Sequence, residues 1–175
     1  MNNIVISDAG PLIALSRIDQ LGLLDKLYGA VFIPVAVQNE LCCDTNLPGA
    51  CCLRLALNDG WIEVHQLVDE TGALARLRLI LDPGESEAIL LAEHVDCRFL
   101  LMDERRGRQV AKNRGLKVVG IAGVLLAAKK NGLLNAVAPE LEALCRAGYR
   151  LSAQLIDEVL RLAGESEQVH PEILS

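Results

Sequence analysis

The chain has 175 residues, of which 51% are hydrophobic and only 3% aromatic, and its formal net charge is −6. This length fits one ordinary domain with a short helical appendage, and the composition predicts a core of Leu, Val, Ile and Ala. The negative charge argues against a protein that coats nucleic acid by charge alone, because such binding needs clustered Lys and Arg. A nuclease remains possible, because a cluster of acidic metal ligands by itself lowers the net charge.

The longest apolar run covers 118–128, which is too short for a bilayer span of about 20 residues. The N-terminus also lacks the basic segment of a signal peptide, so we expect a cytoplasmic protein without a membrane segment. Six cysteines lie at positions 42, 43, 51, 52, 97 and 145. Their adjacent pairs do not match the spacing of structural zinc sites. Reduced thiols that pack as small hydrophobic side chains are therefore favoured over zinc.

Short apolar runs alternate with longer amphipathic stretches up to residue 120, which predicts an α/β domain with a mostly parallel sheet. The expected strands cover 4–7, 31–33, 61–64, 98–101 and 117–119. The expected helices between them cover 11–16, 20–28, 35–42, 50–57, 71–81, 83–94 and 104–114.

Beyond residue 120 the pattern indicates helices only. The first begins at residue 121 and closes near Gly132, and the other two cover 139–149 and 152–165. Ser152 is expected to cap the last helix and Gly164 to end it, with Leu155, Val159 and Leu162 on its packing face. We expect a domain over 1–135, an extension over 136–165 packed on it, and a tail over 166–175.

Two acidic positions directly follow apolar strands, and ligands of open parallel sheets bind beyond the carboxyl ends of strands. Asp8 follows the first strand and precedes Pro11, which suits the first helical position. We therefore expect Gly10 to cap that helix and Asp8 to be left free, with an Asp8 cap as the alternative. Asp103 and Glu104 follow the fourth strand, and one of them is expected to cap the next helix.

Two helical glutamates are further candidates. Glu40 follows apolar residues on its own helix face, where a carboxylate needs a partner, a cation or an edge that reaches water. Asp82 and Glu85 match a capping box, which assigns them a structural role. Glu87 has no such role and is the functional candidate of this segment.

A basic run follows the acidic residues of the fourth strand. Residues 105–117 carry six cations and no acid. Most charge runs are solvated helix faces, but this position beside an expected acidic cluster favours contact with phosphates. The candidate nucleic-acid-binding residues are Arg105, Arg106, Arg108 and Lys112.

Asp8, Glu40, Glu87 and Asp103 come from four segments that are expected to meet at one edge of the sheet. Clustered carboxylates repel each other and need a cation, and oxygen ligands suit Mg²⁺ or Mn²⁺. Such an ion beside basic residues indicates phosphodiester hydrolysis, with one or two ions. No Ser/His/Asp arrangement and no Walker loop suggests a competing chemistry.

Four segments resemble, in order, the acidic blocks of the PIN-domain family. They are "VISDAGPLIAL", "FIPVAVQNEL", "DPGESEAILLA" and "LLMDERRGRQVA", and the C-terminal helices resemble those of a prokaryotic branch of PIN-like proteins. The resemblance covers residues 4 to 165. It implies a Rossmann-like three-layer α/β/α sandwich with a central parallel sheet and a helical C-terminal extension.

The resemblance also implies function. It suggests a Mg²⁺- or Mn²⁺-dependent endoribonuclease acting on single-stranded RNA. Many relatives, similar to the VapC group, are toxins of toxin–antitoxin pairs and act as homodimers held by a small antitoxin. The implied catalytic residues are Asp8, Glu40, Glu87 and Asp103, and the implied metal ligands are Asp8, Glu87 and Asp103, with Glu104 as the alternate. The third position is usually Asp in the family, and the longer Glu87 side chain moves its oxygens outward.

The main alternative is a non-catalytic nucleic-acid-binding or protein-interaction module on the same fold, and divalent-metal binding would distinguish the two. A phosphoacceptor receiver domain fits less well, because it needs paired acids after the first strand and a lysine after the last. Here a single Asp8 follows the first strand, and Gly120 follows the last. The sequence carries no signature that separates RNA from DNA substrates.

Overall fold

The computed structural model describes residues 3–165, so the expected tail over 166–175 lies outside the described residues. Its centre is a five-stranded, fully parallel sheet in the order β3-β2-β1-β4-β5. The strands are β1 (Val5–Ser7), β2 (Val31–Pro34), β3 (Ile62–His65), β4 (Phe99–Leu101) and β5 (Val118–Val119). All five predicted strands are confirmed, and β1 and β4 are buried throughout, as expected for strands covered on both faces.

Helices cover the sheet on both sides. Along the sheet part of the chain they are α1 (Ala9–Arg17), α2 (Gly22–Tyr28), α3 (Val35–Glu40), α4 (Ala50–Asn58), α5 (Ala73–Leu77), α6 (Pro83–His94) and α7 (Arg105–Asn113). After β5 they are α8 (Ile121–Lys130), α9 (Ala138–Arg146) and α10 (Ala153–Ala163). This arrangement confirms the predicted three-layer α/β/α sandwich with a central parallel sheet.

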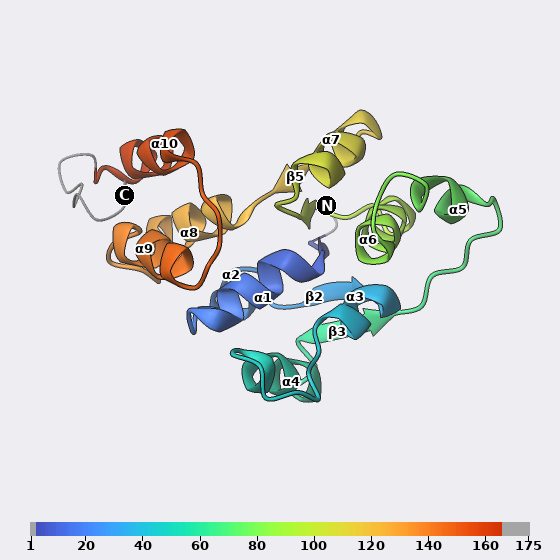
Figure 1. Cartoon of the computed structure of the whole chain (residues 1–175), viewed down its shortest axis with the longest axis horizontal. Helices are drawn as coiled ribbons and strands as arrows, with labels where there is room; N and C mark the ends of the chain where they lie inside the picture. Colours follow the sequence, from blue (N-terminus) through green and yellow to red (C-terminus); the bar gives the residue numbers. More distant parts are fainter. Residues whose placement is uncertain (1–2, 166–175) are drawn as a thin grey trace.

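The strand order places two helices on opposite faces. The chain passes from β1 through α1 to β2 in one direction along the sheet, and from β3 through α6 to β4 in the other. Because such crossovers are right-handed, α1 and α6 cover different faces. Figure 1 shows α8, α9 and α10 gathered on one side of the molecule and α5, α6 and α7 on the other.

Local differences from the sequence predictions have simple causes. Helix α1 begins at Ala9, so Asp8 and not Gly10 is the capping residue by position, although its side chain makes no capping hydrogen bond. Helix α5 begins later than predicted, at Ala73, because Asp69 accepts the N–H groups of Ala73 and Leu74, and it ends earlier, at Leu77. The expected helix 71–81 is therefore wrong at both ends.

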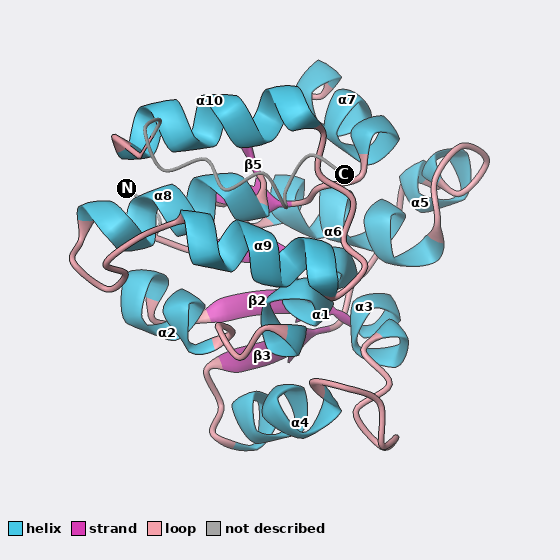
Figure 2. Cartoon of the chain, turned by 60° about the vertical axis from the view of Figure 1, so that its left-hand side comes forward, coloured by secondary structure: helices cyan, strands magenta, loops and turns pink. Residues whose placement is uncertain are grey.

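The C-terminal extension is anchored at its end. The buried carboxylate of Glu165 accepts the N–H groups of Val137 and Ala138 at 2.8 and 2.9 Å and pairs with Lys129 of α8. Ser152 caps α10, as predicted, by accepting the N–H of Leu155 at 3.2 Å. In Figure 2 α10 runs along the top of the molecule, and its beginning lies beside α7.

The packing face of α10 differs from the predicted one. Val159 is buried as expected, but its buried companions are Ile156 and Leu160, whereas Leu155 and Leu162 are 40% and 57% exposed. The predicted boundary between domain and extension at residue 135 stays a prediction.

All six cysteines are free, and four of them pack partly buried against the core, as the thiol interpretation expects. Cys42 and Cys51 differ from this expectation because they are exposed. Among residues 3–165, no helix has the length and apolar character that a membrane crossing requires.

Candidate functional site

Asp8 lies at the centre of the carboxyl edge of the sheet. It follows β1 directly, and its N–H donates to the carbonyl of Leu101 at the end of β4 (2.9 Å). The connections change direction between β1 and β4, and such a switch point is where open α/β sheets bind ligands. Asp8 is only 7% exposed, and its Oδ1 has no hydrogen-bond partner among residues 3–165.

The electrostatic environment of Asp8 identifies its acidic neighbours. Burial raises the pKa of Asp8 from the ordinary 3.8 to about 7, although the N–H of Ala9 acts in the opposite direction. The negative charges of Glu85, Glu40 and Asp103 contribute to this raised pKa. These four carboxylates, from Asp8, Glu40, Glu85 and Asp103, form what we call the acidic cluster.

The charge of Glu85, and not that of Glu87, acts on Asp8. Glu85 Oε2 accepts the N–H of Asp82 at 3.2 Å in the predicted capping box, but Glu85 Oε1 is buried without a partner in the described chain. The expectation that Glu87 has no structural role is wrong, because Glu87 accepts the N–H of Ala36 at 3.0 Å and pairs with Arg78 at 2.7 Å. Residues two apart on a helix do not face each other. Glu87 therefore points towards α3, where it accepts the N–H of Ala36 and its charge raises the pKa of Glu40.

A capping box uses only one carboxylate oxygen of its glutamate, so the box at the start of α6 leaves the second oxygen of Glu85 available. This signal was present in the sequence. The catalytic and metal-binding assignment of Glu87 stays a prediction, but its oxygens are engaged with Ala36 and Arg78.

Glu40 reaches the site from the end of α3. The residue is exposed, which fits the expectation of a glutamate at an edge that reaches water, and Oε1 accepts the N–H of Gly84 at 2.9 Å. Gly84 belongs to the first turn of α6, where the helix dipole favours a carboxylate. Partial burial raises the pKa of Glu40, and the Gly84 N–H opposes that rise.

Asp103 is held by groups from two later segments. Both of its oxygens accept the N–H of Ile121, at 3.2 and 3.1 Å, at the start of α8. Burial raises the pKa of Asp103, whereas the Ile121 N–H, a hydrogen bond from Tyr149 and the charge of Arg108 lower it. Glu104 is the residue that caps α7, accepting the N–H of Arg106 at 3.4 Å.

Three glycines lie so close to carboxylates of the acidic cluster that a side chain at these positions would collide with them. A Cβ on Gly107 would lie 2.5 Å from Glu85 Oε1, and a Cβ on Gly120 would lie 2.5 Å from Asp103 Oδ1. A Cβ on Gly84 would also collide with the carboxylate of Glu40. The backbone is therefore shaped around the acidic cluster, a relation between distant residues that no local pattern reveals.

Three of the four predicted basic residues share one surface. Arg105, Arg108 and Lys112 line a groove of about 920 Å³ that also contains Asp103. On an α-helix Arg106 is turned about 100° away from Arg105, and it is not among the residues that line this groove. Arg108 also donates to the carbonyl of Met102 at 2.7 Å, which positions its guanidinium beside Asp103.

The donor chemistry of the acidic cluster suits Mg²⁺ or Mn²⁺, because all four groups are carboxylates and two buried oxygens, on Asp8 and Glu85, have no partner in residues 3–165. As placed, the described side chains do not form a group of three ready to hold a metal. The carboxylate ligands are of the type that Mg²⁺ and Mn²⁺ prefer, and metal binding would have to bring these side chains closer together.

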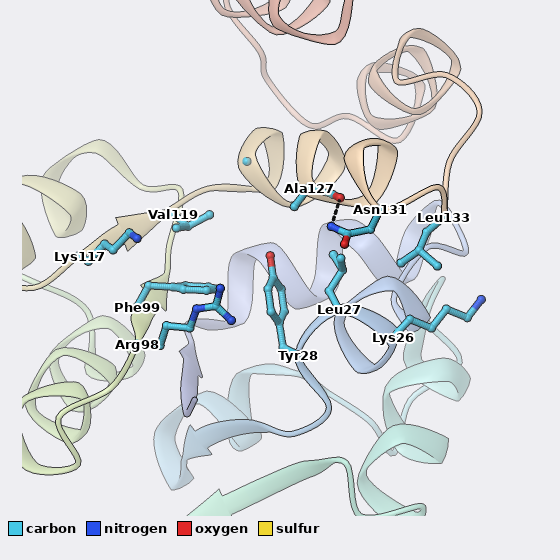
Figure 3. Close-up of a pocket in the computed structure, with 11 residues that line it drawn as sticks. Lys26, Leu27, Tyr28, Arg98, Phe99, Lys117, Val119, Ala127, Asn131 and Leu133 are labelled. Carbon is cyan, nitrogen blue, oxygen red and sulfur yellow. Dashed lines mark hydrogen bonds between the residues drawn. The ribbon is translucent and has the colours of Figure 1, made fainter. Parts of the chain in front are cut away.

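A second cavity, of about 600 Å³, lies at the opposite edge of the sheet (Figure 3). Its described lining contains the cations Lys26, Arg98 and Lys117 but no carboxylate, so it offers no metal ligands of this kind. Figure 3 shows Lys26 pointing away from Arg98 and Lys117. Lys26 lies in the last turn of α2, where a cation balances the negative end of the helix dipole.

Comparison with known proteins agrees with the fold. Residues 4–165 match the DUF3368 family model, which is described as a PIN domain. No curated protein matches the chain. PIN domains are generally nucleases and typically use divalent metals, which is consistent with carboxylates gathered at the switch point of the sheet. Because the match covers nearly the whole described chain, this protein belongs to the PIN-domain family.

Proposed function

We propose that this protein is a metal-dependent endoribonuclease that hydrolyses phosphodiester bonds of single-stranded RNA. The observation that carries the proposal is the pair of buried carboxylate oxygens, Asp8 Oδ1 and Glu85 Oε1, without a partner in the described chain and inside the acidic cluster. A buried carboxylate without a partner is costly unless it is protonated or bound to a cation. A divalent ion would satisfy both oxygens together.

Asp8, Glu85 and Asp103 would hold the ion, with Glu40 at the rim of the cluster. Mg²⁺ or Mn²⁺, when bound, supplies a positive charge that lowers the pKa of water and offsets charge on a scissile phosphate. We include Glu85 and not Glu87 among the proposed metal ligands, because the carboxylate of Glu87 already contacts Ala36 and Arg78.

The remaining residues of the site position these ligands and the substrate. The N–H of Ile121 fixes the direction of the Asp103 carboxylate. Arg105, Arg108 and Lys112 line the adjoining groove, where they would bind phosphates and hold the strand beside the acidic cluster.

A non-catalytic nucleic-acid-binding module is the second candidate. It is favoured by Asp103, whose oxygens both accept the N–H of Ile121, and by the lack of a three-ligand group among residues 3–165. Such a module would bind RNA through the basic groove without cleaving it.

The proposal is tested by incubating the full chain with labelled single-stranded RNA and DNA in Mn²⁺, in Mg²⁺ and in EDTA. We expect RNA cleavage that requires the metal and is lost in Asp8→Asn. RNA binding without cleavage, together with no Mn²⁺ binding by calorimetry, would establish the module instead. Metal-dependent cleavage retained by Asp8→Asn would refute the site.

A matched pair of variants tests the choice between the two glutamates of α6. Glu85→Gln should abolish metal binding and cleavage, because it removes the negative charge of a carboxylate that acts on Asp8 and has a buried oxygen without a partner in the described chain. Glu87→Gln removes the same charge two residues away and should retain both. If Glu87→Gln loses metal binding and cleavage while Glu85→Gln retains them, Glu87 and not Glu85 is the third acidic residue of the site.

The proposal extends to the partners that the PIN resemblance suggests, namely a second copy of the chain and a small antitoxin, in the cytoplasm. Light scattering of the purified chain tests the homodimer, and a mass of 18.9 kDa would contradict it. Growth arrest on expression, relieved by a co-expressed adjacent small protein, would support the toxin role.

A further inference from the structure

The groove beside Asp103 has two walls that come from different parts of the chain. One wall is α7, with Arg105, Arg108 and Lys112, and the other is the beginning of α10 in the extension and the residues just before it, with Arg150, Ser152 and Leu155. Figure 2 shows the beginning of α10 beside α7, in agreement with this lining. The predicted nucleic-acid-binding residues supply only the first wall.

The groove is strongly positive in an otherwise acidic chain. Its described lining holds the four cations Arg105, Arg108, Lys112 and Arg150 and the single acid Asp103, although the net charge of the chain is −6. Arg105, Lys112 and Arg150 are exposed and have no ion-pair partner among residues 3–165. Cations gathered without acidic partners repel each other, and a polyanion relieves this repulsion.

Arg150 is held in place by its neighbours on both sides. Tyr149 contacts the Asp103 carboxylate through its side chain, and Ser152 caps α10 by accepting the N–H of Leu155. The far end of α10 is anchored where Glu165 accepts N–H groups of Val137 and Ala138. The extension is therefore docked on the domain, and Arg150 stands at a defined place in the groove wall.

We propose that the C-terminal extension forms the second wall of the substrate groove, and that Arg150 binds a phosphate of a single strand running between α7 and α10 towards Asp103. This inference rests on the proposed function for its choice of RNA. The groove has a volume of about 920 Å³, which is within the range of ligand-binding sites and suits a few nucleotides of one strand. Leu155, exposed beside Arg150, adds an apolar surface for a base.

The test is the affinity of the full chain for a labelled single-stranded RNA, measured by fluorescence anisotropy over a series of salt concentrations in EDTA. Arg150→Ala should weaken binding about fivefold, as expected for one lost charged contact. It should also lower the slope of log affinity against log salt by about 0.7, the value for one phosphate of a single strand.

Arg146→Ala is the matched control. Arg146 belongs to the same extension, and its side chain is 71% exposed and paired with Glu142, outside the groove. Its substitution removes the same charge and should leave both the affinity and the salt slope unchanged. Equal effects of the two substitutions would refute the inference, because they would show that only net charge matters. Tighter binding of a duplex of the same sequence would refute the single-strand geometry.

The outcome is separable from that of the proposed function. If wild type binds RNA in EDTA more tightly than Arg150→Ala does but never cleaves it, the proposed nuclease activity is refuted and the proposed RNA-binding groove is supported. If wild type cleaves RNA with metal but Arg150→Ala binds and cleaves RNA equally well, the proposed role of the groove is refuted and the proposed nuclease activity is supported. Absence of binding by wild type even at low salt would refute the groove.

Discussion

Replacing Asp8 by Asn should stabilise the protein, although it removes a central carboxylate of the site. Burial is the main reason that the pKa of Asp8 rises to about 7, and the neighbouring Glu85, Glu40 and Asp103 add to it. Asp8 Oδ1 also lacks a hydrogen-bond partner in the described chain. An amide of the same shape carries no charge, and it can donate a hydrogen bond to an adjacent carboxylate.

The size of the effect follows from proton linkage. In the unfolded chain Asp8 ionises near its ordinary pKa of 3.8, whereas in the folded protein it ionises at about 7. Between these values the folded state binds more protons than the unfolded state, so the free energy of unfolding falls as pH rises. A difference of about three pKa units corresponds to about 4 kcal/mol, which is lost from wild type as pH rises from about 4 to above 7.

The assay is urea unfolding of wild type and Asp8→Asn at pH 4 and at pH 8, in EDTA. The two proteins should have similar free energies of unfolding at pH 4, and the variant should be more stable at pH 8 by up to about 4 kcal/mol. Asp157→Asn, on the exposed side of α10, controls for the change in net charge. Millimolar Mn²⁺ should raise the stability of wild type at pH 8 but not that of Asp8→Asn, because a ligand of the folded state stabilises it.

Equal stabilities of wild type and Asp8→Asn at pH 8 would refute this reasoning, because they would show that Asp8 is not forced to ionise in an unfavourable place. A gain of the same size at pH 4 and pH 8 would also refute it, since the effect would then not come from charge.

Three further variants test the surroundings of the acidic cluster. Tyr149→Phe removes the hydrogen bond that positions the Asp103 carboxylate. It should weaken Mn²⁺ binding about tenfold, measured by calorimetry, and leave RNA affinity in EDTA unchanged. Unchanged Mn²⁺ affinity would exclude this role of Tyr149. Gly107→Ala places a methyl against Glu85 Oε1 and should also weaken Mn²⁺ binding, because the end of a flexible side chain moves more easily than backbone. Glu165→Gln weakens the hydrogen bonds from the N–H groups at the start of α9 and removes the ion pair with Lys129. It should lower the free energy of unfolding by about 2 kcal/mol. Burial opposes the ionised form of Glu165, but Lys129 and the two N–H groups keep its pKa lowered. The stability difference between wild type and Glu165→Gln should therefore be complete near neutral pH and shrink below about pH 4.

Local patterns predicted the framework of this protein well. The apolar runs located all five strands, and the match of Asp82, Pro83 and Glu85 to a capping box located the start of α6. These features depend on residues within a few positions of each other. Apolar patterning and helix capping act over the same short distances, so the sequence is sufficient to locate these elements, although the strands pair with partners far along the chain.

The candidate site was predictable where it depended on strand ends. Asp8 and Asp103 follow β1 and β4, which are neighbours in the sheet, so their convergence required only the parallel topology. The basic residues of α7 were predicted from an unbroken run of cations, and helical periodicity explains why one of them, Arg106, is turned away from the groove.

The sequence by itself determined the strands, most helix boundaries and the two aspartates at strand ends, because each follows from apolar runs or capping residues within a few positions of one another. Only the tertiary structure decided which glutamate of α6 meets Asp8, since the rotation of a helix about its axis is set by its packing on the sheet. It also decided that Tyr149 and Arg150 lie beside Asp103, a contact across about 46 positions that forms only when the extension docks. Packing between distant segments has no local signature, which is why these residues of the site could not be found in the sequence.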